Sequence, residues 1–467
     1  MKKKIILINP PLYFSQGRPH ALDVSVPPLG LLYLASYINK YLKSFKAEVI
    51  DVMVNNYSLS SLKSIITRNK PFIVGITSMT PQLQGAVELA AYLKLNFKKI
   101  KIFLGGPHVS ADPDFVNRFS DIFDYAVMGE AEKTFSESMI KLSKGRKIPK
   151  IQTGEAILDL DTIPFPDKKL INRQKYSQYE SMMFSRGCPY HCYYCSRPSI
   201  SKKVRYRSVS NLIKEIKSVY KYCQGKIDFQ DDTFTLNRGK VIDFCKEVTE
   251  ENLNLDWRCN TRIDLVDEEL LAAMKKAGCS LIHFGIESGN EKIRKEIVNK
   301  GQFTNKQIYK VFNWCKKYKI KVAGYFMIGH PEESKKDLED TKEMILNSGI
   351  DLLGLSIPTP FPGSKLYEIA KERGIVNEEI IDKFARKELG EGYVGNYPVF
   401  VSEKVSREYI YALMREINRK FYINFRTLFK KLKEDLLPPK KLYIDVKDLF
   451  TLILRGVSSR KPYVSKK

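Results

Sequence analysis

Short apolar runs alternate with helical stripes through most of the first 375 residues, and this alternation restricts the fold more than any other feature. In residues 1–145 the predicted strands are residues 4–9, 48–53, 72–76, 100–104 and 124–127. Periodic stretches such as residues 29–42 and 82–95 lie between them. Strand–helix alternation predicts a parallel sheet with helices on both faces. Such a sheet binds ligands at the carboxyl ends of its strands.

Residues 179–375 repeat the alternation. The predicted strands there are residues 182–185, 226–229, 255–259, 281–285, 321–327 and 352–357. Helical stretches follow the first five, and right-handed crossovers would curl such units into an open barrel with its catalytic loops at the carboxyl ends of the strands. Residues 146–178 are polar and contain three prolines, so we predict a linker there.

Residues 376–467 lose the strand pattern and are predicted to be helical. One amphipathic stripe comprises Ile410, Leu413, Met414, Ile417, Phe421, Phe425, Leu428 and Leu432. Its other face is basic, which favours a solvated helix packed on the barrel and leaves contact with a membrane surface or RNA as the alternative. The basic end, residues 460–467, is predicted to be disordered.

The chain carries a formal net charge of +25. An anionic partner would suit this charge, but the basic residues are spread along the sequence, which favours an ordinary solvated surface. No apolar run approaches the ~18 residues that span a bilayer. We therefore expect a cytoplasmic protein, with peripheral membrane contact as the alternative.

Three of the eight cysteines, Cys188, Cys192 and Cys195, lie within eight residues, directly after the first predicted barrel strand. Thiolates are the usual ligands of iron–sulfur clusters, and three of them leave one iron of a four-iron cluster open. Structural zinc prefers four ligands in paired spacing, and the chain has no second Cys-x2-Cys pair. His191 lies between two of the cysteines, where ring closure would be cramped. A cluster is therefore favoured over zinc.

The segment Ser185-Arg186-Gly187-Cys188-Pro189-Tyr190-His191-Cys192-Tyr193-Tyr194-Cys195 resembles the radical S-adenosylmethionine (SAM) superfamily over about residues 179–365. The resemblance implies a [4Fe–4S] cluster whose open iron binds the methionyl amine and carboxylate of SAM. One electron from the cluster then cleaves the sulfur–C5′ bond. The resulting 5′-deoxyadenosyl radical removes a hydrogen atom from the substrate.

Residues at the ends of the later strands match SAM-contacting positions of that family. Tyr194 would lie near the adenine, and one of Asp231 and Asp232 would contact the methionyl amine while the other caps the next helix. Arg262 would bind a carboxylate or form a surface salt bridge. Glu287 would accept bonds from the ribose or the amine, and Gly329 would lie near the adenine edge.

The first 145 residues look like the cobalamin (B12)-binding domain that is fused to many radical enzymes. The expected cobalamin contacts are Pro28, Gly30, Thr77, Ser78, Gly105, Gly106, His108, Gly129 and Glu130. The chain has no Asp-x-His-x-x-Gly motif, so we expect no cobalt ligand from that motif and read His108 as a loop or cap residue. A domain that keeps this fold without binding B12 is the alternative.

Taken together, these patterns and resemblances predict an α/β protein. A Rossmann-like (flavodoxin-like) cobalamin-binding domain spans residues 1–145, and a linker spans 146–178. A partial (β/α)6 TIM-type radical SAM barrel spans 179–375, and a helical region with a basic tail spans 376–467.

The resemblance implies methylation of an unactivated carbon in a small-molecule or lipid substrate, with an external one-electron donor of the flavodoxin or ferredoxin type. Cyclisation or rearrangement without B12 is one alternative. A transfer-RNA-modifying enzyme is another, but the methylthiotransferases carry a second cluster in their first domain, and residues 1–187 contain no cysteine. The last alternative is a non-enzymatic metal protein that binds RNA or membranes.

Overall fold

A computed structural model of the chain describes residues 2–20, 26–197, 203–300, 303–390, 397 and 399–422. The chain forms two compact units. The first comprises residues 1–259, 276–279 and 360–399, and the second comprises residues 260–275, 280–359 and 400–467. The first predicted domain and the start of the predicted barrel therefore lie in the same unit.

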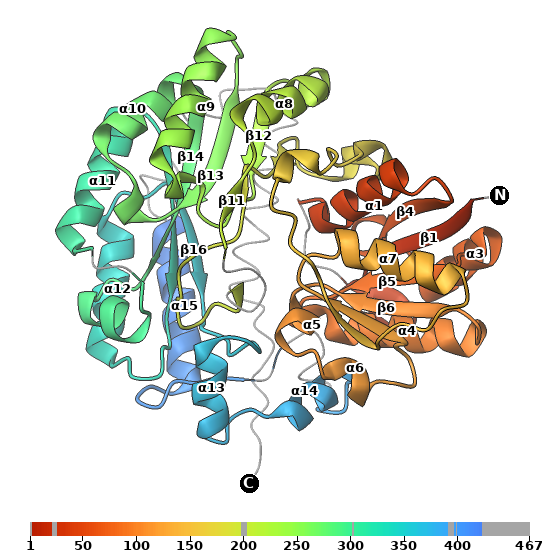
Figure 1. The fold of residues 1–467 in the computed structure, drawn as a ribbon. Coiled ribbons are helices and arrows are strands. Elements are labelled where there is room, and N and C mark those ends of the chain that lie inside the picture. Colours follow the sequence, from red (N-terminus) through yellow and green to blue (C-terminus); the bar gives the residue numbers. More distant parts are fainter. Residues whose placement is uncertain are drawn as a thin grey trace, which may run out of the picture. The chain divides into compact units, whose positions relative to one another are not determined.

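The first unit begins with a six-stranded parallel sheet (Figure 1). Its strands lie in the order β4 (Phe45–Asp51), β1 (Lys3–Asn9), β5 (Ile73–Thr77), β6 (Lys101–Gly105), β7 (Tyr125–Met128) and β8 (Ile151–Thr153). The order reverses between β1 and β5, and open α/β sheets bind ligands at such a reversal. The predicted flavodoxin-like sheet is confirmed.

Helices cover both faces of this sheet. Ile5 and Leu7 of β1 lie in one core cluster with α1 (Leu29–Tyr41) and with Phe135 of α7 (Glu132–Ser143). Ile6 and Ile8 are also buried and point to the other face, because successive strand residues alternate. The helices α3 (Leu59–Asn69) and α4 (Leu83–Asn96) contact each other. A strand buried on both faces explains the unbroken apolar run at residues 5–8.

The sheet extends past residue 145, into the range predicted to be a linker. Within that range β8 pairs in parallel with β7, from Ala126 opposite Ile151 to Met128 opposite Thr153. Three apolar side chains that follow, Ile157, Leu160 and Ile163, are buried in the core cluster of the first sheet. Residues 146–163 are therefore part of the first sheet and its core, although their lysines and prolines are typical of a loop.

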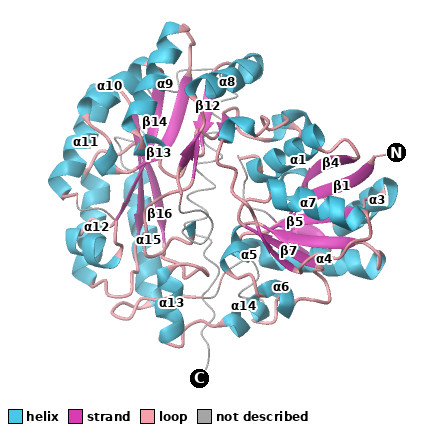
Figure 2. Cartoon of the chain, viewed as in Figure 1, coloured by secondary structure: helices cyan, strands magenta, loops and turns pink. Residues whose placement is uncertain are grey.

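The second six-stranded sheet corresponds to the predicted barrel. Its order is β16 (Leu352–Ser356), β15 (Lys321–Met327), β14 (Cys279–Glu287), β13 (Asp256–Thr261), β12 (Lys226–Phe229) and β9 (Glu180–Met182). The helices between them are α8 (Val209–Cys223), α9 (Arg238–Glu250), α10 (Glu268–Lys276), α11 (Asn305–Lys317) and α12 (Lys335–Asn347). Figure 2 separates these strands from their helices by colour.

The predicted first barrel strand, residues 182–185, is divided in the structure. β9 ends at Met182, and Ser185–Arg186 forms β10, which pairs antiparallel with β11 (Arg205–Tyr206). The cysteine segment therefore lies between the two strands of a short ladder. This ladder holds both ends of the segment close together in the first unit.

The described C-terminal residues form two helices, α14 (Glu378–Ala385) and α15 (Arg407–Tyr422), and the residues described between them are irregular. In the second unit, α15 buries Ile410, Leu413, Ile417 and Phe421 and contacts α12. This confirms the first half of the predicted amphipathic stripe. Phe425, Leu428, Leu432 and the basic tail lie outside the described residues. Among the described helices, none has the length and hydropathy needed to cross a membrane.

Candidate active site

The cysteine segment lies on the loop between β9 and α8. Cys188, Cys192 and Cys195 are partly exposed, whereas the other five cysteines are buried. Gly187 precedes them with a φ of 96°, a conformation that favours glycine. The backbone N–H of Cys195 donates to the carbonyl of Cys192 at 3.0 Å, which forms a turn between these two cysteines. The three thiols predicted from the spacing are therefore the partly exposed ones, and the other five are buried.

The surroundings of these thiols suit sulfur ligands of a cluster. The backbone N–H of Arg197 donates to Cys195 Sγ at 3.4 Å, and Thr233 Oγ1 lies 3.8 Å from Cys188 Sγ. Within the described residues, no three His, Cys, Asp or Glu side chains lie close enough to hold one metal ion. A four-iron cluster does not need this, because each thiolate binds a different iron. Three exposed thiols on one loop therefore fit such a cluster.

The two other candidates on this loop differ in exposure. Tyr194 is partly buried and packs edge-on against buried Tyr193, with ring centroids 5.9 Å apart. His191 is exposed. The position of Tyr194 next to the last cysteine is compatible with an adenine contact, which stays a prediction.

Asp231 follows β12 and is 1% exposed. Its carboxylate accepts hydrogen bonds from the backbone N–H of Phe184 at 2.9 Å and from the N–H and Oγ of Ser185 at 2.5 Å each. Burial raises the pKa of Asp231 to about 6 even though these hydrogen bonds act to lower it. This carboxylate therefore anchors the strand that leads into the cysteine segment.

Asp232 has a different partner. Its Oδ1 accepts from Arg197 Nε at 2.8 Å and from Nη2 at 2.7 Å, two residues beyond the last cysteine. The predicted helix-capping role is wrong for both aspartates, because Asn237 caps α9 through its side chain. The two acidic residues instead anchor the chain before and after the cysteines.

Arg262, in the second unit, is 4% exposed and forms a two-pronged ion pair with Asp264. The two N···O distances are 2.9 and 2.8 Å. The predicted salt bridge exists, but its arginine is buried and only its aspartate is partly exposed. A carboxylate ligand for Arg262 stays a prediction.

Glu287, at the end of β14, is 4% exposed and accepts a hydrogen bond from Lys300, which is 8% exposed. Its φ is 71°, and the register between β14 and β15 shifts between Gly285 and Glu287. A non-glycine residue held at positive φ is often found at functional sites. The charge of this carboxylate is balanced by Lys300, which suits contact with neutral ribose hydroxyls.

Gly329 follows β15 with a φ of 96°. Its N–H and that of His330 donate to Glu333 Oε2 at 2.7 and 3.1 Å. Glu333 is fully buried, and its Oε1 has no hydrogen-bond partner among the described residues. Burial raises the pKa of Glu333 to about 8, the two N–H groups act to lower it, and Asp337 adds to the increase.

The raised pKa of Glu333 predicts a pH-dependent stability. Because the folded state holds this proton more tightly than the unfolded state, ionisation opposes folding, so stability falls as pH rises from about 4.5 to about 8. We expect Glu333→Gln, which stays neutral, to show a flatter dependence in urea unfolding at pH 6 and pH 8.5. Equal slopes for both proteins would show that another group causes the dependence.

In the first unit, the loops after β1 and β5 flank the point where the strand order reverses. Asn9 Nδ2 donates to Asp51 Oδ1 at 3.2 Å, and Gln82 Nε2 donates to Asn9 Oδ1 at 3.1 Å and to the Pro10 carbonyl at 3.0 Å. Tyr176 donates to Asp51 at 2.8 Å. These bonds fix the edge on which we expected the cobalamin.

The pair Gly105-Gly106 lets the loop after β6 pack closely against the loop after β5. A Cβ at Gly106 would lie 2.5 Å from Thr77 Oγ1 and 2.8 Å from Ser78 N, and its φ is 95°. Ser78 is buried and donates its backbone N–H to the Gly105 carbonyl at 2.9 Å. Gly106 is therefore required by close loop packing, independently of any ligand.

His108 is 1% exposed and shares a hydrogen bond of 3.1 Å between Nδ1 and Thr80 Oγ1. Burial lowers its pKa to about 4, so the ring is neutral near pH 7. Its ring packs edge-on against Phe115. The ring is therefore a core element beneath the loop and does not reach the surface as a ligand.

Two of the remaining expected cobalamin contacts are the glycines Gly30 and Gly129. Gly30 is exposed in the first turn of α1, whose N-cap is Pro28, and a Cβ at Gly30 would meet nothing within 4 Å. Gly129 follows β7 with a φ of 71°. The backbone N–H of Gly129, which is partly exposed, donates to Ser110 Oγ at 2.8 Å. An exposed glycine such as Gly30 lets a large ligand approach the backbone closely, so the edge fits a cobalamin.

Glu130, in contrast, is engaged by two arginines. It accepts hydrogen bonds from Arg186 at 3.1 Å and from Arg205 Nη1 at 3.1 Å, and Arg186 also pairs with Glu132 at 2.8 Å. Burial acts to raise the pKa of Glu130, but the two arginines bring it below its usual range. Glu130 thus ties the first sheet to both strands that flank the cysteine segment.

We expect Glu130→Gln to destabilise the protein by about 3 kcal/mol, because breaking a mostly buried ion pair leaves charge uncompensated. Arg205, which is 6% exposed, would lose its carboxylate partner. Thermal unfolding measures the effect. Glu155→Gln is the control, because Glu155 is exposed and, among the described residues, forms an ion pair with Lys133 alone. Equal melting temperatures for the two variants would contradict the prediction.

Three residues that lie beside the candidates were not predicted from the sequence, namely Arg186, Lys300 and Glu333. Arg186 lies two residues before Cys188, so its place in the motif was a usable signal. Lys300 and Glu333 are charged residues in loops, and nothing local distinguishes them from exposed ones. Only tertiary burial identifies them.

Comparisons with known proteins agree with this geometry. A Radical SAM superfamily model matches residues 182–345, and a B12 binding domain model matches residues 21–138. An uncharacterized methyltransferase, PH0819, from Pyrococcus horikoshii is 32% identical over 451 residues, which cover 92% of this chain and 95% of the relative. The chain belongs to the radical SAM superfamily. It is a member of the group that carries a B12-binding domain, and its cofactors are a [4Fe–4S] cluster, SAM and cobalamin.

Other relatives of this radical SAM protein extend the comparison. The anaerobic magnesium-protoporphyrin IX monomethyl ester cyclase of Rubrivivax gelatinosus is 26% identical, over 89% of this chain and 84% of the relative. The solved structure of the radical SAM methyltransferase TsrM from Kitasatospora setae has a TM-score of 0.69 at 16% identity and covers 89% of each chain. The second likeness confirms the fold.

Proposed function

We propose that the chain methylates a carbon atom of a small-molecule or lipid substrate. The observation that carries the proposal is the relation, over almost the whole length, to a protein named a methyltransferase. It is supported by the cysteine loop and the B12-type sheet, which share one compact unit. When bound, the cluster with SAM supplies a carbon-centred radical, and cobalamin supplies the methyl group.

The residues of the chain have distinct parts in this proposal. Cys188, Cys192 and Cys195 would hold three irons, and Asp231 keeps the preceding strand in place through Ser185. Glu287 would accept hydrogen bonds from the ribose of SAM.

The cobalamin would lie on the carboxyl edge of the first sheet, where the exposed Gly30 leaves the backbone accessible. His108 would give no cobalt ligand, since its ring is buried. An external flavodoxin- or ferredoxin-type protein would deliver the electron.

A second candidate is ring closure without net methylation. The cyclase relative favours it, since it covers 89% of this chain. Both reactions begin with the same hydrogen abstraction, so the geometry of the cysteine loop does not separate them. They differ in whether a methyl group leaves SAM.

The test uses anaerobically reconstituted protein with cobalamin, dithionite and SAM whose methyl group carries deuterium. Small-molecule and lipid extracts of the source cells serve as the substrate pool. Methylation predicts 5′-deoxyadenosine, S-adenosylhomocysteine and a product that is heavier by the labelled methyl group, and the last two should vanish without cobalamin. A product without label would favour ring closure. No 5′-deoxyadenosine from protein that holds its cluster would contradict both reactions.

A further inference from the structure

The edge of the first sheet opposite the cofactor loops has its own chemistry. All six strands are parallel, so they all begin at this edge, and the helices that return to it end there. The backbone N–H of Lys3 donates to the Ser44 carbonyl after α1, and Lys3 Nζ donates to the Ser143 carbonyl at the end of α7. The N–H of Phe72, after α3, donates to the Lys4 carbonyl.

Cations gather at this edge. Those that are exposed and have no ion pair with the described residues include Lys43, Lys70, Lys98, Lys99, Lys144 and Arg146. Two acidic residues near the strand starts are already paired, Asp124 with Lys94 at 2.5 Å and with Lys101 at 3.2 Å, and Glu48 with Lys46 at 3.6 Å. The edge therefore presents a strongly positive surface.

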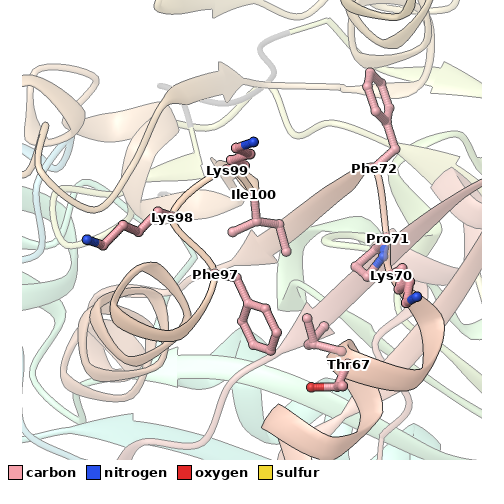
Figure 3. Close-up of a pocket in the computed structure, with 9 residues that line it drawn as sticks. Thr67, Lys70, Pro71, Phe72, Phe97, Lys98, Lys99 and Ile100 are labelled. Atoms are coloured by element: carbon pink, nitrogen blue, oxygen red, sulfur yellow. The ribbon is translucent and has the colours of Figure 1, made fainter.

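Apolar side chains lie among these cations. Leu95, in the last turn of α4, is 78% exposed, and Tyr41, at the end of α1, is 47% exposed. A hollow of about 560 Å³ lies at the same edge, between the segment that follows α3 and the segment that follows α4. It is lined by Ile66, Thr67, Lys70, Pro71, Phe72, Phe97, Lys98, Lys99 and Ile100. Figure 3 shows the side chains of Lys70, Lys98 and Lys99 around Phe97 and Ile100.

We propose that this surface, the amino-edge patch, docks the protein on an anionic lipid bilayer. The patch comprises the six cations above with Tyr41, Leu95 and Phe97. Basic residues interspersed with exposed apolar side chains are typical of surfaces that lie in a membrane interface, because cations meet the anionic headgroups while apolar groups enter the acyl boundary. The inference does not rest on the proposed function.

An RNA partner fits the patch less well. Single-stranded nucleic acids bind to cations and to exposed aromatic rings on which their bases stack. The most exposed apolar side chain here is instead the aliphatic Leu95, and the rings of Phe72 and Phe97 are partly buried. The one exposed ring of the patch, Tyr41, has its hydroxyl bonded to the Thr162 carbonyl at 2.7 Å. A leucine that is 78% exposed among lysines gains most from hydrocarbon. The observations therefore favour lipid.

The experiment is co-sedimentation of the full-length protein with vesicles of phosphatidylcholine, with or without phosphatidylglycerol. We expect binding to the mixed vesicles only, and weaker binding as salt rises. The variant K70E/K98E/K99E should bind at least about a hundredfold more weakly, because each lysine near an anionic surface contributes roughly a fivefold factor and the new carboxylates are repelled by the headgroups. Leu95→Ser, at an exposed position, should lower binding severalfold without changing the fold.

The control is K214E/K306E/K336E, which makes the same change of charge at exposed lysines outside the patch. It should bind mixed vesicles far better than K70E/K98E/K99E. Equal vesicle binding by the two triple variants would overturn the proposal, since the affinity for vesicles would then depend on the net charge of the protein and not on the patch. So would wild-type protein that binds transfer RNA but no vesicles, or a Leu95→Ser variant that binds vesicles as the wild type does.

Discussion

Replacing Cys192 with alanine is expected to abolish both the bound iron and the cleavage of SAM. Two remaining thiolates hold a four-iron cluster poorly, because each ligand secures a different iron. The Sγ of Cys192 is partly exposed on a loop, so its loss leaves the fold intact. Iron analysis and the visible absorbance of reconstituted protein measure the first effect, and 5′-deoxyadenosine formation measures the second. We expect turnover to fall below detection.

Cys315→Ala is the matched control, because it removes one thiol from the core of the second unit and leaves the loop unchanged. Cys315 lies on α11 and is fully buried, so its loss costs some stability by leaving a small cavity. The iron content should stay at the wild-type value. If Cys315→Ala also lost its cluster, the assignment of three loop thiols would be incomplete.

Replacing Asp231 with alanine is expected to lower the free energy of unfolding by about 3 kcal/mol, because buried donors without partners cost about 1–3 kcal/mol each. The variant leaves the N–H groups of Phe184 and Ser185 without their acceptor. Since Ser185 lies three residues before Cys188, we also expect less iron per chain after reconstitution. Urea unfolding and iron analysis check the two parts.

Two further variants make the Asp231 prediction decisive. Ser185→Ala removes one of the three hydrogen bonds and should show a milder form of both effects, even if Asp231→Ala fails to fold. Asp232→Asn is the stability control, because its ion pair with Arg197 is partly exposed and such pairs contribute little. Unfolding of Asp231→Ala at the wild-type urea concentration would show that its carboxylate does not anchor the strand.

Most of the fold follows from local pattern. The strands at residues 226–229 and 321–327 have the predicted bounds, because each begins directly after a helical stripe and contains the apolar residues of a buried strand. The predicted strand at residues 182–185 is wrong. The Asp231 carboxylate, which is 46 and 47 residues away in the sequence, binds the N–H groups of Ser185 and Phe184, and these residues therefore leave the sheet. No local pattern reports such a contact. β8 was missed for a related reason, as an edge strand of three residues needs little hydrophobicity.

The candidate site was likewise predictable only where its chemistry is local in the sequence. Cys188, Cys192 and Cys195 could be predicted because their chemistry is contained in one short segment. Asp231 and Glu130 were found as candidates, but their partners were not, because a carboxylate looks the same in the sequence whether it faces a cofactor, a backbone amide or an arginine. Burial decides between these roles, and burial depends on residues far away in the chain.

The strand β8 has a practical consequence for anyone who wishes to excise the cobalamin-type domain and study it alone. A cut at residue 145 would strip the sheet of its last strand and leave the edge of β7 open to pairing with other copies, which invites aggregation. It would also uncover the core that Ile157, Leu160 and Ile163 close. A fragment that ends after residue 163 retains both, although Glu130 would still lack its two arginines.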